Sequence, residues 1–166
     1  MDHLVSLGHR DIVHIDGGHA PGAIERRAGY ENAMRSHGLS RWIRILPGDY
    51  TELSGAAAAR LLLADEKLPT AVIAGNDQCA AGLLDELRWV GIDVPGQISV
   101  VGYDDSRLAR LAHIDLTTVR QDAEQLARLA VNAAIERIDD GRDPQHPRVF
   151  RLAPHLVIRG STGPAR

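Results

Sequence analysis

The chain has 166 residues, 44% of them hydrophobic, which fits one domain with a sizeable core. Its 19 Lys and Arg against 22 Asp and Glu give a net charge of −3, without basic clusters, so the chain alone is a poor candidate for binding nucleic acid. The single cysteine excludes an internal disulfide, and the sequence shows neither a secretory leader nor an apolar run of the roughly 20 residues that cross a bilayer. We therefore expect a cytoplasmic globular protein with no membrane span.

The first eight residues are predicted to be the last turns of a helix that ends at Gly8, and we expect further residues upstream, because domains rarely begin inside a helix. The rest of the sequence alternates between strand and helix patterns. Strands are expected at 11–16, 42–46, 70–74, 98–101, 116–119, 148–152 and 155–159. Helices are expected at 23–37, 51–64, 78–90 and 122–140, with a short helix and loop at 106–115, a linker at 141–147 and a loose tail at 160–166.

The stretch 69–105 shows this pattern most completely. An apolar strand ends at Gly75, Asn76 or Asp77 can cap the helix that follows, and Gly91 can end it. A strand–helix–strand unit of this length is parallel and right-handed, so we predict an α/β fold with a three-layer, doubly wound parallel sheet. Apolar residues at helical spacing predict the core-facing positions of three helices: Ile24, Ala28 and Met34; Leu53, Ala57 and Leu61; and Ala80, Leu83, Leu84, Leu87 and Val90.

Polar side chains stand where the predicted strands end, and in open parallel sheets ligands bind at this edge. Arg26 and Asp104 can each hold two adjacent ligand hydroxyls or ring nitrogens, Asn76 can donate and accept, and the Tyr50 ring can cover an apolar face. Such a set suits a small polyhydroxylated or heterocyclic ligand. The residues at these strand ends are Arg26, Asp49, Tyr50, Asn76, Asp77, Asp104, Asp105, Arg120, Gln121 and Asp122.

Each of these residues also has a purely structural interpretation. Asn76 has the position of a helix cap, and Asp104 that of a residue ending a strand. Arg26 lies beside a second arginine and can be a solvated surface charge, while Tyr50 can belong to the core.

The sequence lacks the motifs of several common classes of catalytic and metal site. The sequence contains no G-x-S-x-G, G-x-x-x-x-G-K-[ST] or G-x-G-x-x-G pattern and no H-x-x-x-H pair, so we predict no catalytic residue, no metal site and no cofactor. His9, His14 and His19 are expected in surface or turn positions. Cys79 lies in the first turn of a helix, which can make a thiol reactive, but a small buried filler is the favoured interpretation.

Six stretches connect this sequence to a known family: HLVSLGHRDIVHIDG, RRAGYENA, AVIAGNDQCAAGLL, DVPGQISVVGYDD, LTTVRQD and HLVIRGSTGP. In this order they cover nearly the whole chain and resemble the lactose- and galactose-repressor (LacI/GalR) family of bacterial transcription regulators. The resemblance implies a periplasmic-binding-protein-like C-terminal subdomain: residues 1–119 and 148–166 form the C-terminal lobe of a two-lobed effector-binding core, and helix 122–140 belongs to the N-terminal lobe. The family's N-terminal helix-turn-helix has no counterpart here, so direct DNA binding is not expected.

The resemblance places the family's effector contacts on Arg26, Tyr50, Asn76, Asp104 and Gln121, all of them among the strand-end residues. It implies a sensor of a sugar-like small molecule that controls DNA binding through the missing helix-turn-helix domain. The alternative is a solute-binding module of a sugar transport system, which would need a secretion leader upstream.

The resemblance also implies a homodimer, formed partly by helix 78–90 and the segment after Asp105. Ala80, Ala81 and Leu84 would let two such helices approach closely, or would face this chain's own sheet. Helix 122–140 is expected to pack against a second copy or to be mobile, because its partner lobe is absent.

Overall fold

The computed structural model describes residues 1–139 and 149–166, and within them six strands form one sheet in the order β2-β1-β3-β4-β5-β6. The first five strands are parallel, and β6 is antiparallel to β5. This arrangement confirms the predicted α/β fold with a doubly wound, mainly parallel sheet. The strands are β1 (Ile12–Ile15), β2 (Arg44–Leu46), β3 (Ala71–Ala74), β4 (Ser99–Asp104), β5 (Thr117–Arg120) and β6 (His155–Val157).

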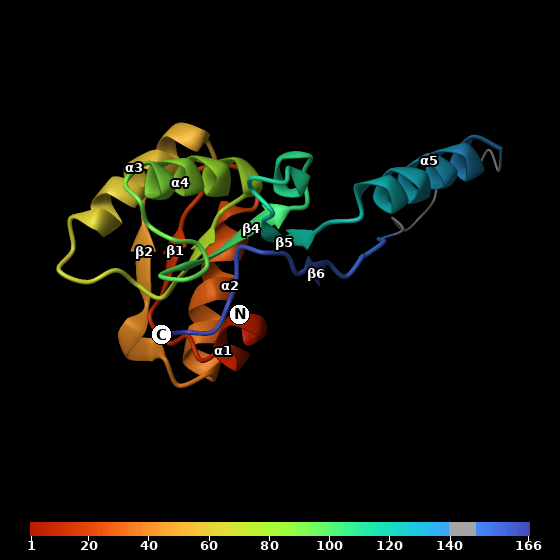
Figure 1. The fold of residues 1–166 in the computed structure, drawn as a ribbon. Coiled ribbons are helices and arrows are strands. Elements are labelled where there is room, and N and C mark those ends of the chain that lie inside the picture. The colour runs from red at the N-terminus through yellow and green to blue at the C-terminus, as the bar shows by residue number, and fades with distance from the viewer. Residues whose placement is uncertain (140–148) are drawn as a thin grey trace.

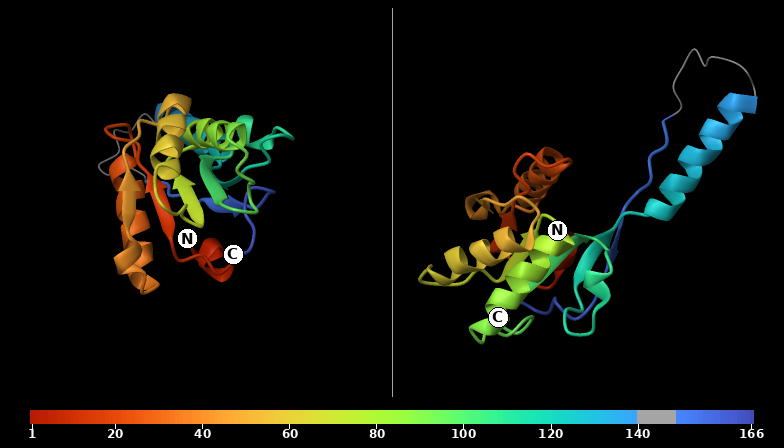
Figure 2. Two further views of the ribbon diagram at one scale, coloured as in Figure 1. Left: turned by 60° about the vertical axis from the view of Figure 1, so that its left-hand side comes forward. Right: turned by 90° about the horizontal axis from the view of Figure 1, so that it is seen from above.

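Helices cover both faces of the sheet (Figure 1). Helices α1 (Asp2–Ser6) and α2 (Ala23–Ser36) lie on one face, and α3 (Glu52–Leu63) and α4 (Asp77–Trp89) pack side by side on the other. The short 3₁₀ helices η1 (Ser40–Trp42) and η2 (Leu108–Arg110) lie in connections. Helix α5 (Ala123–Asp139) extends away from this layered body, as Figure 1 and the right-hand view of Figure 2 show.

The C-terminal part departs from the sequence prediction in two places. Residues 149–152 form no strand, because β6 already pairs with β5 and no other described strand lies beside them; Arg148 lies outside the described residues, as does the predicted linker. The tail predicted to be loose is held instead: Ser161 exchanges hydrogen bonds with Val100, and Ala165 donates to the Leu7 carbonyl. The tail therefore closes the amino-terminal edge of the sheet.

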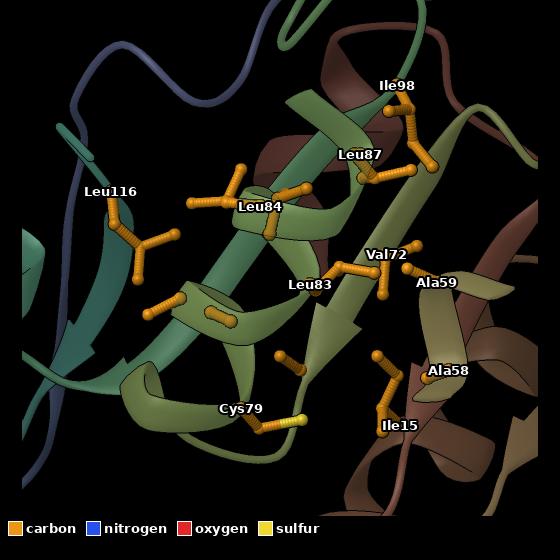
Figure 3. Packing of buried hydrophobic residues seen from close by; sticks show 14 of the residues in the cluster. Ile15, Ala58, Ala59, Val72, Cys79, Leu83, Leu84, Leu87, Ile98 and Leu116 are labelled. Atoms are coloured by element: carbon orange, nitrogen blue, oxygen red, sulfur yellow. The ribbon is translucent and has the colours of Figure 1, made fainter. Parts of the chain in front are cut away.

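The core lies mainly between the sheet and the pair α3 and α4, where Leu83, Leu84 and Leu87 are fully buried (Figure 3). The core-facing positions predicted for α4 are confirmed except Val90, which follows the helix and is half exposed. The prediction of surface or turn positions is wrong for His9 and His14, because both side chains are buried and His14 lies within β1. Each ring reaches a backbone carbonyl that satisfies one nitrogen.

The predicted core face of α3 is wrong, and that of α2 is correct only at Met34. Leu53 is 83% exposed and Ile24 is 72% exposed, while Met34 alone of the α2 set is buried. Helix α3 turns its smallest residues inward, because α4 approaches it backbone to backbone: a β-carbon added at Gly55 would lie 1.9 Å from the Cys79 carbonyl oxygen. The buried residues of α3 are Gly55, Ala58, Ala59 and Leu62, whereas Leu53, Ala57 and Leu61 face outward.

No helix among residues 1–139 and 149–166 combines the length and the apolar character that a bilayer crossing requires.

Candidate functional site

Arg26 lies at the carboxyl edge of the sheet, in the first turn of α2. The helix starts there because Gly22 adopts a left-handed conformation with φ of 79°. From this position Nη1 donates to the Gly75 carbonyl oxygen at 2.5 Å, and Nη2 lies 3.7 Å from Asp104 Oδ1. Arg26 thus connects the ends of β3 and β4, and its surface-charge interpretation is wrong because the side chain is only 20% exposed.

Two aromatic rings hold this guanidinium. Its central carbon lies 3.9 Å from the ring centre of Tyr103 and 5.0 Å from that of Tyr50, both distances at which a cation is attracted to an aromatic face. The sequence reasoning missed Tyr103. Its position next to Asp104 at the end of β4 was the available signal.

The Tyr50 ring packs against Gly17 and Gly75, where any larger residue would collide with it. A β-carbon at Gly17 would lie 2.1 Å from the Tyr50 ring, and one at Gly75 would lie 2.5 Å from it. The ring therefore lies over the ends of β1 and β3, while its backbone has φ of 71°, a conformation that non-glycine residues rarely adopt. Such strain is typical of ligand clamps. Burial raises the pKa of the Tyr50 hydroxyl above its usual value, against the effect of Arg26.

Asp104 and Gln121 form the opposite side of the site. Gln121 Nε2 donates to Asp104 Oδ1 at 3.0 Å, and the register of β4 and β5 pairs Asp104 with Arg120. Burial raises the pKa of the Asp104 carboxyl, while Arg26 and Gln121 act in the opposite direction. A cavity of about 340 Å³ begins here; Tyr103, Asp104, Gln121 and Asp122 form its polar side, and Ala123, Leu126, Leu152, Ala153 and Pro154 its apolar side.

Asn76 is the N-cap of α4, as its structural interpretation predicted. Its side-chain oxygen accepts a hydrogen bond from the Cys79 backbone N–H at 2.8 Å, and the residue is buried. Only its side-chain NH2 group would be free to contact a ligand. Of the five predicted contacts, the structure thus joins Arg26, Tyr50, Asp104 and Gln121 in one chain of interactions and places Asn76 in a cap beside them.

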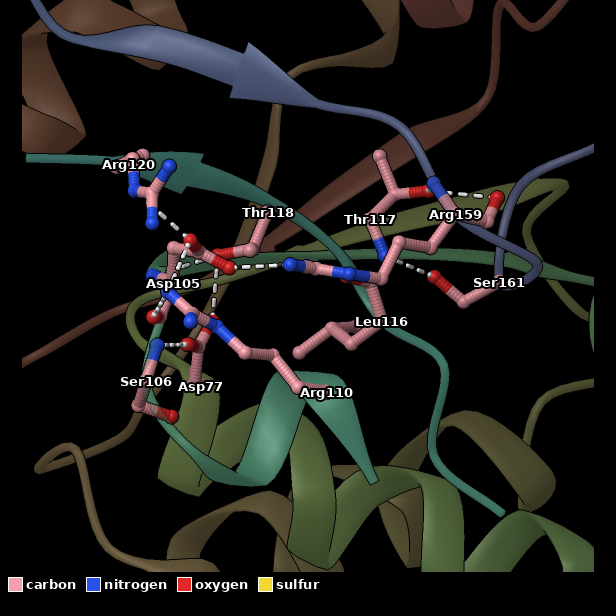
Figure 4. A network of polar contacts seen from close by, with 10 residues as sticks. All are labelled: Asp77, Asp105, Ser106, Arg110, Leu116, Thr117, Thr118, Arg120, Arg159 and Ser161. Atoms are coloured by element: carbon pink, nitrogen blue, oxygen red, sulfur yellow. Dashed lines mark hydrogen bonds and ion pairs between the residues drawn. The ribbon is translucent and has the colours of Figure 1, made fainter. Parts of the chain in front are cut away.

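A second polar cluster, which the sequence reasoning did not identify, surrounds Asp105, the residue after Asp104 (Figure 4). The carboxylate of Asp105 is buried and contacts Arg110, Arg120 and Arg159. Arg110 is 5 positions from Asp105 but Arg159 is 54 positions away, so no local pattern could reveal the whole cluster.

Residues 1–139 and 149–166 contain no group of three or more His, Cys, Asp or Glu side chains that could hold a metal ion. Cys79 is fully buried, and burial raises the pKa of its thiol to about 11, which confirms the interpretation as a buried filler.

Comparisons with known proteins show the family to which the chain is similar. A family model described as a periplasmic binding protein-like domain matches residues 1–162. The HTH-type transcriptional repressor PurR of Glaesserella parasuis is 36% identical to this chain, and the match covers 96% of this chain and 48% of the repressor. The chain thus spans about half the length of the curated relatives it matches.

Solved structures show the same likeness. A LacI transcriptional regulator from a Rhodococcus species is 51% identical, with a TM-score of 0.91 over 99% of this chain and 60% of that protein. A LacI family regulator from Enterococcus faecium with bound ribose is 26% identical, with a TM-score of 0.88 over 99% of this chain and 60% of that protein. The chain therefore belongs to the LacI/GalR family of transcription regulators, as a part of their periplasmic-binding-protein-like effector core.

Proposed function

We propose that this chain is the effector-sensing portion of a LacI/GalR-type transcription regulator. The observation that carries the proposal is the Arg26 guanidinium, held between Tyr50 and Tyr103 and directed at Asp104. The positive charge of Arg26 and the aromatic surface of the two tyrosines thus lie together at the sheet edge where α/β proteins bind ligands. The transport alternative has no comparable support, because the relatives reported above are named as transcription regulators.

The proposed effector is a small carbohydrate. Guanidinium and carboxylate groups can each bind two neighbouring hydroxyls, and aromatic rings favour the apolar faces of sugar rings. The ribose bound by the Enterococcus faecium regulator supports this ligand class. The five predicted contacts, Arg26, Tyr50, Asn76, Asp104 and Gln121, are the proposed binding residues.

The remaining parts of the regulator would lie outside this chain. We propose that residues 1–119 and 148–166 form one lobe, that α5 contributes to the other lobe, and that a helix-turn-helix domain contacts the operator in the cytoplasm. The isolation of α5 from the layered body in Figure 2 supports this division. Its exposed apolar residues, Leu126, Val131, Ile135 and Ile138, would then be covered by the other lobe.

We also propose a homodimer, but through residues other than Ala80, Ala81 and Leu84. Ala80, Ala81 and Leu84 are buried within this chain, so they are not available to a second copy. The outward face of α3 is a better candidate, since Leu53, Ala57 and Leu61 form an exposed apolar stripe along it. A Leu53→Glu variant should remain monomeric in sedimentation velocity at concentrations where the parent chain dimerises.

The proposal is tested by a thermal-shift screen of pentoses, hexoses, disaccharides and nucleosides, followed by calorimetric titration of each ligand found. We expect a sugar to bind, and expect Arg26→Ala and Asp104→Ala to abolish its binding. Arg35→Ala, at the exposed end of the same helix, serves as the control and should bind as the parent does. Binding that survives both site variants would refute the assignment of this site.

The intact mass of the native protein in its own cells tests the regulator assignment. A mass well above the 18.0 kDa of this chain would support a longer regulator with operator-binding activity. A mass near 18.0 kDa would contradict it and indicate a free-standing lobe.

A further inference from the structure

The buried carboxylate of Asp105 is bound by three arginines, although one would neutralise it. Arg159 Nη2 lies 2.5 Å from Oδ1, Arg110 Nη2 lies 2.8 Å from Oδ2 and Arg120 Nε lies 3.0 Å from Oδ2. The Asp105 side chain is 2% exposed and Arg159 is 16% exposed, so this contact is poorly screened by solvent, whereas Arg110 and Arg120 are 53% and 43% exposed. Figure 4 shows the guanidinium groups converging on the carboxylate from different segments.

Two of these segments are the connections between the layered body and α5. Arg120 is the last residue of β5, where the chain leaves toward α5, and Arg159 follows β6, where the chain has returned. Arg159 Nη1 also donates to the Leu116 carbonyl at 2.7 Å, which fixes the returning segment to the start of β5. A single carboxylate thus ties both connections to the end of β4.

The same carboxylate is adjacent to the ligand site. Asp104 and Asp105 both have positive φ, 120° and 51°, a backbone region that residues other than glycine rarely adopt and that the surroundings must hold in place. Asp77 at the start of α4 helps to hold this turn, because its carboxylate accepts hydrogen bonds from Thr118 Oγ1 at 2.5 Å and from the Ser106 backbone N–H at 2.7 Å. The turn is thus bonded to α4, β5 and the returning segment together.

We propose that Asp105 is a positioning residue that couples the direction of the Asp104 carboxylate to the orientation of α5. A movement of Asp104 would displace Asp105 through the shared backbone, and Asp105 would displace Arg120 and Arg159, which bound the two connections. The use of this coupling in effector sensing rests on the proposed function; the mechanical coupling itself does not.

The orientation of α5 can be measured directly. Spin labels on Asp85→Cys in α4 and Ala134→Cys in α5, both at exposed positions, report the distance between the body and α5 by double electron–electron resonance. Cys79 is fully buried and can stay in place. Asp105→Asn keeps the shape of the side chain but removes its charge, and we expect it to broaden the distance distribution while the protein still melts cooperatively.

Arg107→Gln is the matched control, because it removes one positive charge from the same loop at an exposed position without touching Asp105. The control should keep the parent distribution. The Gln121 side-chain amide resonance reports the other end of the coupling, since this group donates to Asp104. It should shift in Asp105→Asn and stay unchanged in Arg107→Gln, which a loss of overall stability alone would not produce.

A folded Asp105→Asn protein with the parent distance distribution and an unshifted Gln121 resonance would overturn the proposal. If Asp105→Asn does not fold, Arg120→Gln and Arg159→Gln replace it, since each leaves two arginines on the carboxylate. Each of these variants should broaden the distance distribution. Parent-like distributions in both would also overturn the proposal. A broadened distribution in a protein that binds no sugar supports the coupling and contradicts only the proposed function.

Discussion

The guanidinium carbon of Arg26 lies 3.9 Å from the centre of the Tyr103 ring. With the hydrogen bond to the Gly75 carbonyl, this stacking fixes the plane of the guanidinium, so that its remaining donors point in one direction. A preorganised arginine loses less side-chain entropy when a ligand binds. We therefore expect Tyr103 to contribute to effector affinity even without touching the ligand.

Replacement of Tyr103 tests this contribution. Tyr103→Leu should weaken effector binding by about 2- to 30-fold, which corresponds to the roughly 0.5–2 kcal/mol of a cation–π contact. Tyr103→Phe keeps the ring and should bind nearly as the parent does. Calorimetric titration with a sugar identified by the thermal-shift screen measures both, and equal affinity of the Leu variant would rule out this role.

Asp104 should make effector binding depend on pH. Burial raises the pKa of its carboxyl, so the carboxylate becomes protonated at a higher pH than an ordinary aspartate does. Because the ionised form is the one that accepts hydrogen bonds from ligand hydroxyls at both oxygens, affinity should fall as pH decreases through this raised pKa. Titrations between neutral and acidic pH measure the effect, which should disappear in Asp104→Asn.

The same raised pKa has a consequence for stability. The folded protein holds the Asp104 proton more tightly than the unfolded chain, so this group's contribution to stability is present at low pH and is lost as pH rises through the folded pKa. At neutral pH the ionised carboxylate therefore costs stability. Asp104→Asn should raise the melting temperature of the free protein while it weakens binding, and a lower melting temperature would contradict this account.

Local signals in the sequence were sufficient for much of the fold. Asn76 as a helix cap, Gly91 as a helix end and the apolar run before Gly75 each act on neighbouring backbone, so their patterns are readable. The set at the strand ends followed from topology, since parallel strands bring their carboxyl ends together. Arg26 and Asp104 meet for this reason although 78 positions separate them.

What the sequence did not reveal depends on tertiary contacts. Helical spacing identified an apolar stripe on α3, but it could not show that the small residues opposite Leu53 form the buried face. The role of Asp105 depends on Arg159, which belongs to a segment that returns after α5. Packing partners of this kind follow only from the assembled sheet.

The close approach of α3 and α4 predicts a strong effect of Gly82→Ala. A β-carbon at Gly82 would lie 1.9 Å from the Glu52 carbonyl oxygen, so the two helices would have to separate. Overpacking of this kind costs about 1–3 kcal/mol or more of unfolding free energy. Gly29→Ala is the control, because no atom lies within 4 Å of its new β-carbon and the higher helix propensity of alanine should stabilise α2 by roughly 1 kcal/mol. Urea unfolding of both variants measures these effects, and equal stabilities would contradict them.

Cys79 should react with thiol reagents only after unfolding. Its side chain is fully buried and burial raises the thiol pKa to about 11, so both access and thiolate formation are suppressed. The absorbance of Ellman's reagent should show no rapid reaction in native protein at neutral pH and one equivalent of thiol in denaturant. Rapid reaction of the native protein would mean that the first turn of α4 opens readily.

His14 should make the protein less stable under mildly acidic conditions. The residue is 2% exposed, and burial lowers the pKa of its imidazole, opposed by its hydrogen bond to the Ile73 carbonyl and by Asp16. The unfolded chain therefore takes up the proton first, and the contribution of neutral His14 is present above the unfolded pKa and is lost as pH falls below it.

Urea unfolding at a series of pH values between 7.5 and 5 measures this linkage, with the unfolded pKa of about 6.5 inside the range. The change in unfolding free energy that His14 causes should be at most about 1.4 kcal/mol per pH unit, the value for one proton. His14→Gln cannot take up a proton and should show a smaller loss of stability over the same range. His19→Gln, at an exposed turn position of the same segment, is the control and should keep the parent slope. Equal slopes for all three proteins would show that His14 is already protonated, or accessible to water, in the folded state.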